Sequence, residues 1–152
     1  MALVQFAGER TLAYPFDHVS ARLNDASWLA SSLLHAEQVQ LQGPDRASWK
    51  VRPPVSFVSG LIESTITVLE RQAGRMVRWR IAGKSVGASS TTEITMHLEA
   101  DGENRTRVKW SAEVTEMTGL LKLAPKGLVG ATANKVVEEV WQGVERKLAA
   151  GQ

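Results

Sequence analysis

Histidines, serines and acidic residues are the groups of this sequence that could carry catalysis, and their spacing argues against it. His18, His35 and His97 are far apart, without the His-x-x-x-His spacing of helical metal sites. No serine is expected at the strand-to-helix turn that a hydrolase nucleophile needs, because residues 89–92 have the pattern of a strand start. The absence of cysteine excludes disulfides, thiolate metal sites and a cysteine nucleophile. We therefore expect no catalytic residue, no metal ligand and no cofactor.

Few polar side chains fall on the buried side of the predicted strands. Strand parity places Ser64, Glu70 and Thr106 there, with Glu70 near the end of a hairpin. General acid–base chemistry needs a titratable group within hydrogen-bond reach of a substrate, usually with a partner. These three residues form no such pair, so binding without chemical change is favoured, with Ser64 as a polar contact for the ligand.

Four of the five tryptophans are predicted to meet in one interior. Strand parity turns Trp49, Trp79 and Trp110 inward, and helical spacing puts Trp141 on an apolar stripe. Buried aromatic side chains dominate most domain cores, so simple packing explains them. The alternative is that they line a cavity for an apolar ligand, and both interpretations stay open at this point.

Small residues gather on the predicted C-terminal helix at Gly127, Gly130 and Ala131. A helix-interior glycine costs about 1 kcal/mol relative to alanine, so it needs a compensating reason. Close approach of a ligand is one reason and close approach of a strand is the other. We include all three residues in the expected ligand site.

Two apolar segments are candidates for contact surfaces. Residues 53–60 carry Phe57 between proline and glycine breakers, which suits either a mobile lid over a ligand or an ordinary strand start. We place Phe57 in the expected ligand site. Residues 120–126 resemble a short amphipathic surface with lysines beside leucines, a pattern that also suits contact with a membrane surface.

Charge gives no indication of nucleic acid as a partner. Lys and Arg total 18 against 16 Asp and Glu, for a net charge of +2. Nucleic-acid binding requires basic residues gathered on one face, whereas in this sequence acidic residues are interspersed with basic ones. Strand parity makes the bases at 78, 80, 105, 107 and 109 outward cross-strand neighbours of Glu93 and Glu99. A self-compensating, solvated sheet face is the simpler interpretation than an anion-binding patch.

The elements that must position these residues are read from hydrophobic periodicity. Two short helices are expected after the first strand, one from Phe16 to Leu23 and one capped by Asp25 and reaching Leu33. The seven predicted strands span residues 3–12, 35–41, 47–51, 61–71, 76–81, 93–99 and 106–115.

A long C-terminal helix is predicted over residues 120–148, with a kink or restart at Pro125. Its apolar stripe should cover one face of the antiparallel sheet, which makes the chain an α+β protein. The 152 residues suit a single domain spanning residues 1–152. Polar residues expected on the solvent side of this helix are Lys126, Lys135, Glu138, Glu139, Gln142, Glu145 and Arg146.

This order of elements, together with several short motifs, resembles the START-like (SRPBCC) helix-grip superfamily, of which Bet v 1-like proteins are part. The motifs are Phe6-Ala-Gly8, Ala13-Tyr-Pro15 and Leu23-Asn-Asp25. Two further segments, KVRPPVSFVSG at residues 50–60 and GKSVG at residues 83–87, are similar to the CoxG family, named for the G subunit of carbon monoxide dehydrogenase. The resemblance covers nearly the whole chain.

The resemblance implies a curved seven-stranded antiparallel sheet gripping the C-terminal helix, with an apolar cavity between them. It also implies an accessory protein of a molybdenum hydroxylase, which binds a quinone-type or other lipid and assists membrane attachment. The same superfamily supports polyketide cyclase or dehydratase enzymes, and a third alternative is a docking or assembly factor for a larger oxidoreductase.

The expected partners are therefore an apolar small molecule or lipid, a membrane surface in peripheral contact, and a larger oxidoreductase. The sequence starts without a basic, apolar leader and has no apolar run of about 18 residues. We expect a cytoplasmic protein, with peripheral membrane contact as an open alternative.

Overall fold

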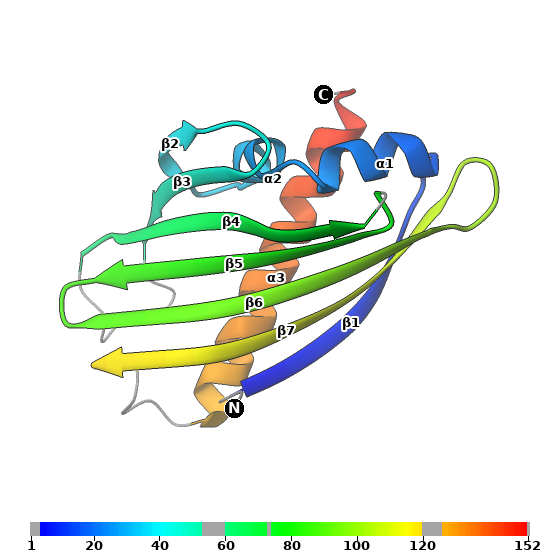
Figure 1. Ribbon diagram of the computed structural model, residues 1–152. Helices are drawn as coiled ribbons and strands as arrows, with labels where there is room; N and C mark the ends of the chain where they lie inside the picture. Colours follow the sequence, from blue (N-terminus) through cyan, green and yellow to red (C-terminus); the bar gives the residue numbers. More distant parts are fainter. Residues whose placement is uncertain (1–3, 53–59, 73, 120–125, 152) are drawn as a thin grey trace.

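The seven predicted strands form one antiparallel sheet in the computed structural model, which describes residues 4–52, 60–72, 74–119 and 126–151 (Figure 1). The strand order is β1-β7-β6-β5-β4-β3-β2, so consecutive strands are neighbours and β1 pairs with β7. The strands are β1 Val4–Leu12, β2 Glu37–Leu41, β3 Arg46–Val51, β4 Ile62–Gln72, β5 Met76–Ser85, β6 Ala88–Ala100 and β7 Thr106–Gly119.

In the described ranges, three helices accompany the sheet: α1 (Phe16–Leu23), α2 (Ala26–Ser32) and α3 (Lys126–Ala149). The predicted cap at Asp25 is confirmed, because its Oδ1 accepts hydrogen bonds from the backbone N–H groups of Ser27 and Trp28 at 2.9 and 3.1 Å. Figure 1 shows α3 crossing one face of the sheet, with α1 and α2 beside its C-terminal end. The predicted α+β helix-grip architecture is confirmed.

The strands at one end of the sheet are longer than the sequence pattern predicts. β5 runs on to Ser85, β6 begins at Ala88, and β7 continues to Gly119. Glycine and small polar residues in these stretches hide the alternation on which the prediction depended. The hairpin is closed by Gly87, whose φ of +78° is a conformation that glycine adopts without steric cost. The extension matters because these strand ends form part of the cavity wall.

The prediction that Glu70 lies on the buried face of the sheet is wrong. The pairing of β4 with β5 shifts register between Val68 and Glu70, which is a β-bulge. An extra residue reverses the alternation, so Glu70 is exposed. Ser64 precedes the bulge on β4 and Thr106 is on β7, and both are buried as predicted. The Thr106 hydroxyl donates a hydrogen bond to the Tyr14 carbonyl at 2.9 Å.

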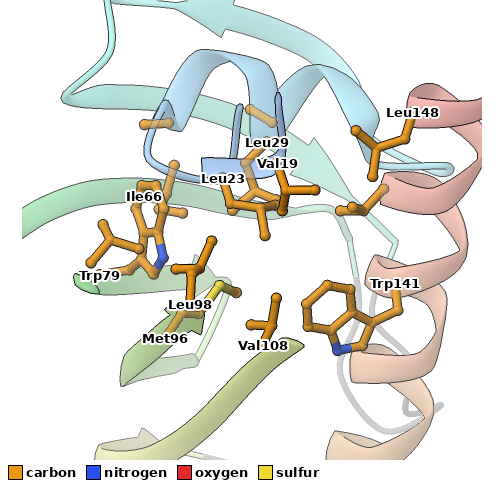
Figure 2. Packing of buried hydrophobic residues seen from close by; sticks show 14 of the residues in the cluster. Val19, Leu23, Leu29, Ile66, Trp79, Met96, Leu98, Val108, Trp141 and Leu148 are labelled. Atoms are coloured by element: carbon orange, nitrogen blue, oxygen red, sulfur yellow. The ribbon is translucent and has the colours of Figure 1, made fainter. Parts of the chain in front are cut away.

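The hydrophobic core lies where the sheet, α1, α2 and the C-terminal half of α3 meet (Figure 2). Val19 and Leu23 of α1 are fully buried there, as are Val77 and Val108 of the sheet. Trp79 stands on the sheet side of the cluster and Trp141 on the helix side, as Figure 2 shows.

Close contact between α3 and α2 occurs at Gly143. A Cβ atom at this position would overlap the backbone carbonyl of Ser32, so only glycine allows the approach. The neighbouring helix residues Trp141, Val144 and Leu148 are at most 3% exposed. Of the two helix glycines whose surroundings are described, Gly143 requires close packing and Gly130 does not.

Arg10 connects β1 to the same part of α3. Its guanidinium pairs with Glu138 at 3.1 Å and with Glu145 at 3.0 Å, and it lies 5.8 Å from the ring centre of Trp141. The hydrogen bonds to Glu145 raise the pKa of Arg10 above its ordinary value. Sequence pattern placed Glu138 and Glu145 on the solvent side of the helix, and their side chains are 59% and 41% exposed there while Arg10 reaches them from the inner face of the sheet.

We expect Gly143→Ala to lower the free energy of unfolding by about 1 to 3 kcal/mol, because its methyl group forces α2 and α3 apart. Gly130→Ala is the matched variant, since a Cβ there meets no described atom within 4 Å. It should raise stability by up to about 1 kcal/mol through helix propensity alone. Urea unfolding of both variants measures the difference, and shifts of the same sign would contradict the assigned contact.

Candidate functional site

A partly open cavity of about 420 Å³ lies between the concave face of the sheet, α2 and α3. This volume falls within the range of about 300 to 1,000 Å³ that small-molecule sites occupy. Apolar side chains dominate its wall. The sheet contributes Phe6, Val51, Ile62, Ile66, Ile81, Ile94, Met96, Ala112, Val114 and Met117, and the helices contribute Leu23, Leu29, Ala30, Val136, Val137, Val140 and Val144.

All four predicted inward tryptophans line this cavity: Trp49, Trp79, Trp110 and Trp141. Trp79 is 0% exposed, Trp141 3% and Trp49 9%, while Trp110 is half-buried. Their strand register is as predicted, and the two interpretations of these residues turn out to be compatible. The same rings pack in the core on one side and form the cavity wall on the other.

Trp110 owes its position to a glycine on the neighbouring strand. Gly8 is paired with Trp110 across β1 and β7, and a Cβ at Gly8 would lie 2.6 Å from the indole ring. Phe6 meets the same ring edge-on, with centroids 6.1 Å apart and planes at 76°. Gly8 thus leaves room for the indole to lie across β1. The Phe6-Ala-Gly8 motif was a visible signal for this arrangement.

Ser64 is the most buried hydroxyl of the cavity wall. It is 7% exposed, lines the cavity, and makes no side-chain hydrogen bond to another described residue. Gly83 stands beside it on β5, and Ser90 follows on β6. The Oγ of Ser64 is accessible from the cavity and not enclosed by protein atoms, so a molecule in the cavity can form a hydrogen bond with it.

Trp79 carries a second unpaired polar atom. Its indole Nε1 is buried and has no hydrogen-bond partner among the described residues. Figure 2 shows the indole within the apolar cluster that also holds Met96 and Leu98. An indole nitrogen can only donate a hydrogen bond. The wall of the cavity therefore contains both an unpaired donor and unpaired hydroxyls in otherwise apolar surroundings.

The remaining expected site residues are not brought to the cavity in the described part of the chain. Ala131 is exposed, and Gly130 is half-buried; neither belongs to the cavity lining, to which the described α3 side chains contribute from Val136 onward. Gly127 is in the first turn of α3, where the structure describes only the backbone. Phe57, Pro125 and the leucine-rich segment from residue 120 lie outside the described residues.

Titratable lining residues were missed by the sequence analysis. Among the described residues of the wall they are His35, Arg52 and Glu139, of which His35 and Arg52 are exposed and Glu139 is half-buried. Glu139 lies three residues after Val136, a spacing that places both on one helix face. No acid–base pair stands among the apolar side chains of the described wall.

Residues 83–87 spell Gly-x-Ser-x-Gly, the letters of a hydrolase nucleophile motif. In the structure the segment is the end of β5 and the turn into β6, so a strand follows the serine instead of a helix. Ser85 is half-buried at the cavity wall and makes no side-chain hydrogen bond to a described histidine or acid. The context that activates a nucleophilic serine is missing around it.

Charges on the outer face of the sheet compensate one another, as predicted. Arg78 pairs with Glu93 at 2.7 Å across β5 and β6. Arg107 has three acidic neighbours, Glu9 at 3.2 Å, Glu99 at 3.4 Å and Asp101 at 3.7 Å. Both of these arginines are therefore neutralised locally.

The curved sheet, the long helix across it and the cavity between them define a START-like, helix-grip protein. The sequence model of the CoxG family, the G subunit of carbon monoxide dehydrogenase, matches residues 8–149, so the chain belongs to this family. No curated protein sequence matches it significantly. In the described residues, no helix is long and apolar enough to cross a membrane.

Solved structures agree with this fold. A conserved protein from Geobacillus kaustophilus is 16% identical with a TM-score of 0.83, over 97% of this chain and 96% of that chain. A START superfamily protein from Mycobacterium smegmatis is 10% identical with a TM-score of 0.72, over 97% and 99%. The Zhui aromatase/cyclase from Streptomyces sp. R1128 is 14% identical with a TM-score of 0.64, over 94% and 89%. At these identities the likeness concerns the fold.

We expect Ser64→Ala to raise the free energy of unfolding of the ligand-free protein by about 1 kcal/mol, because it removes an unpaired hydroxyl from an apolar wall. Ser32→Ala is the control, since the Ser32 hydroxyl is equally buried but donates to the Leu29 carbonyl at 2.6 Å. The control should lose about 1 kcal/mol. Chemical denaturation compares the two, and destabilisation by Ser64→Ala would show that the hydroxyl is satisfied in the free protein.

Proposed function

We propose that this protein binds an apolar small molecule or lipid in the cavity and leaves it chemically unchanged. The observation that carries the proposal is the apolar space of about 420 Å³ that the sheet and α3 leave open. Burial of apolar surface contributes roughly 25 cal/mol per Å², so a ligand of matching size gains affinity without ionic contacts. Membership of the CoxG family supports the proposal, because the fold is one that binds hydrophobic ligands.

A cyclase or dehydratase activity finds less support. Such a reaction needs a general acid or base beside the substrate inside the cavity. The described titratable wall residues are the exposed His35 and Arg52 and the half-buried Glu139. Ser64 and Ser90 offer hydrogen bonds, but a serine hydroxyl with no base beside it is a weak nucleophile.

We also propose an accessory role beside a larger oxidoreductase, with a quinone-type lipid as one candidate ligand. Family membership supports this role. Purification of the full chain from its native source, followed by analysis of co-purifying proteins, tests it. A molybdenum hydroxylase in the complex is the expected result, and its repeated absence would contradict the role without affecting ligand binding.

Mass spectrometry of an organic extract of the purified protein is the direct test of ligand binding. A cavity-filling variant tests whether the ligand binds in this cavity. Ile94 is half-buried and lines the cavity from β6. We expect Ile94→Trp to reduce the extracted ligand at least about tenfold, because the larger ring fills open space at little cost in stability. The same loss should be seen with the neutral dye N-phenyl-1-naphthylamine.

Thr95→Trp is the matched control. Thr95 follows Ile94 on the same strand, so its side chain points to the opposite face of the sheet. This variant should bind like the wild-type protein. Equal binding by Ile94→Trp and wild type, with both folded by circular dichroism, would contradict binding in this cavity.

A further inference from the structure

Hydroxyl groups interrupt the apolar concave face in one row across the sheet. Ser64 on β4, Gly83 on β5 and Ser90 on β6 are direct cross-strand neighbours, and all three line the cavity. We call these residues the hydroxyl row. Trp49 flanks the row on β3 and Met117 on β7, so its polar part is bordered by large apolar side chains.

Gly83 leaves an open space between the two hydroxyls. A Cβ built on Gly83 would lie 3.6 Å from Ser90 Oγ and 3.8 Å from Ser64 Oγ. Both oxygens therefore face the same methyl-sized volume above the glycine. A ligand atom placed slightly above that point is within reach of both hydroxyls.

Neither hydroxyl is used within the protein. Ser64 is 7% exposed and Ser90 is half-buried, and neither side chain has a hydrogen bond to another described residue. By contrast, the buried hydroxyls of Ser20, Ser32 and Thr106 all donate to backbone carbonyls. Among these serine and threonine residues, the two whose hydroxyls form no hydrogen bond with a described residue are the two at the cavity. A ligand in the cavity can form hydrogen bonds with both.

We propose that the hydroxyl row is the polar subsite of the cavity and binds a neutral oxygen, carbonyl or hydroxyl, of an otherwise apolar ligand. This inference rests on the proposed function and specifies the class of ligand. A serine hydroxyl both donates and accepts hydrogen bonds, so it suits either kind of oxygen. Pure hydrocarbons leave the two hydroxyls unsatisfied and are discriminated against.

The ligand group at this subsite is uncharged. The described charged residues of the wall are Arg52 and Glu139, and neither belongs to the hydroxyl row. A carboxylate or phosphate beside Ser64 would lose its hydration without gaining an opposite charge. Neutral hydrogen bonds from two hydroxyls cannot compensate for this loss, whereas they can compensate for the weaker hydration of a carbonyl.

A pair of isosteric probes tests the subsite. 2-Acetylnaphthalene carries a ketone where 2-isopropylnaphthalene carries a methyl group, so the two differ in one oxygen and little in shape. The wild-type protein should bind the ketone about 5- to 20-fold more tightly, as expected for one or two neutral hydrogen bonds. Dissociation constants are measured for each probe by displacement of N-phenyl-1-naphthylamine.

The double variant Ser64→Ala/Ser90→Ala should bind the hydrocarbon at least as tightly as the wild type does and the ketone more weakly than the hydrocarbon, because the lost hydration of the carbonyl is then uncompensated. Ser111→Ala is the control, because Ser111 is exposed on β7 between the inward-facing Trp110 and Ala112. It should keep the full preference for the ketone. Loss of preference in the control to the same extent would overturn the assignment.

Gly83→Ala tests the space between the hydroxyls while keeping both of them. Its methyl group would occupy the position that the ligand oxygen approaches, and it meets Ile62 Cγ2 at 3.2 Å, which requires a small shift of that side chain. We expect the ketone preference to fall at least fivefold. A Gly83→Ala protein that is folded and retains the wild-type preference would overturn the proposal.

Failure of this inference is distinguishable from failure of the proposed function. Tight and equal binding of the two probes by the wild type overturns the polar subsite and leaves apolar binding intact. Failure of both probes to displace the dye, together with an empty organic extract, overturns the proposed function and the subsite with it.

Discussion

The close contact of α3 with α2 at Gly143 is the constraint on which the rest of the structure depends. It brings the helix backbone onto the Ser32 carbonyl and buries Trp141, Val144 and Leu148 beside it. Arg10 adds a second attachment from β1 through Glu138 and Glu145. Both attachments lie in the C-terminal part of α3, so this part is held against the core while the helix crosses the sheet at a fixed place.

The cavity follows from that one-sided attachment. Towards its N-terminus α3 presents Val136, Val137 and Val140, which are only partly covered, and Val136 is 39% exposed. The sheet below carries large rings such as Trp79 and Trp110, but the curved surface between strands and helix is too wide for them to fill. Space remains for a ligand because the helix is not drawn down onto the sheet along its whole length.

Much of the fold could be predicted because strand alternation is a robust signal. It placed Trp49, Trp79 and Trp110 on the correct face, and the pairing of Arg78 with Glu93 follows from the same alternation. The signal fails where one residue is inserted, as at the bulge before Glu70, since nothing in the local composition marks the shift. The site itself was less predictable, because periodicity tells which face of a helix is apolar but not which stretch of that face touches another element. Gly130 and Gly143 look alike in the sequence, yet one has open space above it and the other a backbone carbonyl.

The division of α3 into an attached and an open half separates two properties that a single helix would otherwise link. Unfolding requires the contacts at Gly143, Trp141 and Leu148 to break. The part of the cavity wall that α3 supplies at Val136 and Val137 lies before these contacts, and neither valine is fully buried. Substitutions at Val136 or Val137 can therefore reshape the cavity at less cost in folding stability than substitutions at Gly143 or Leu148.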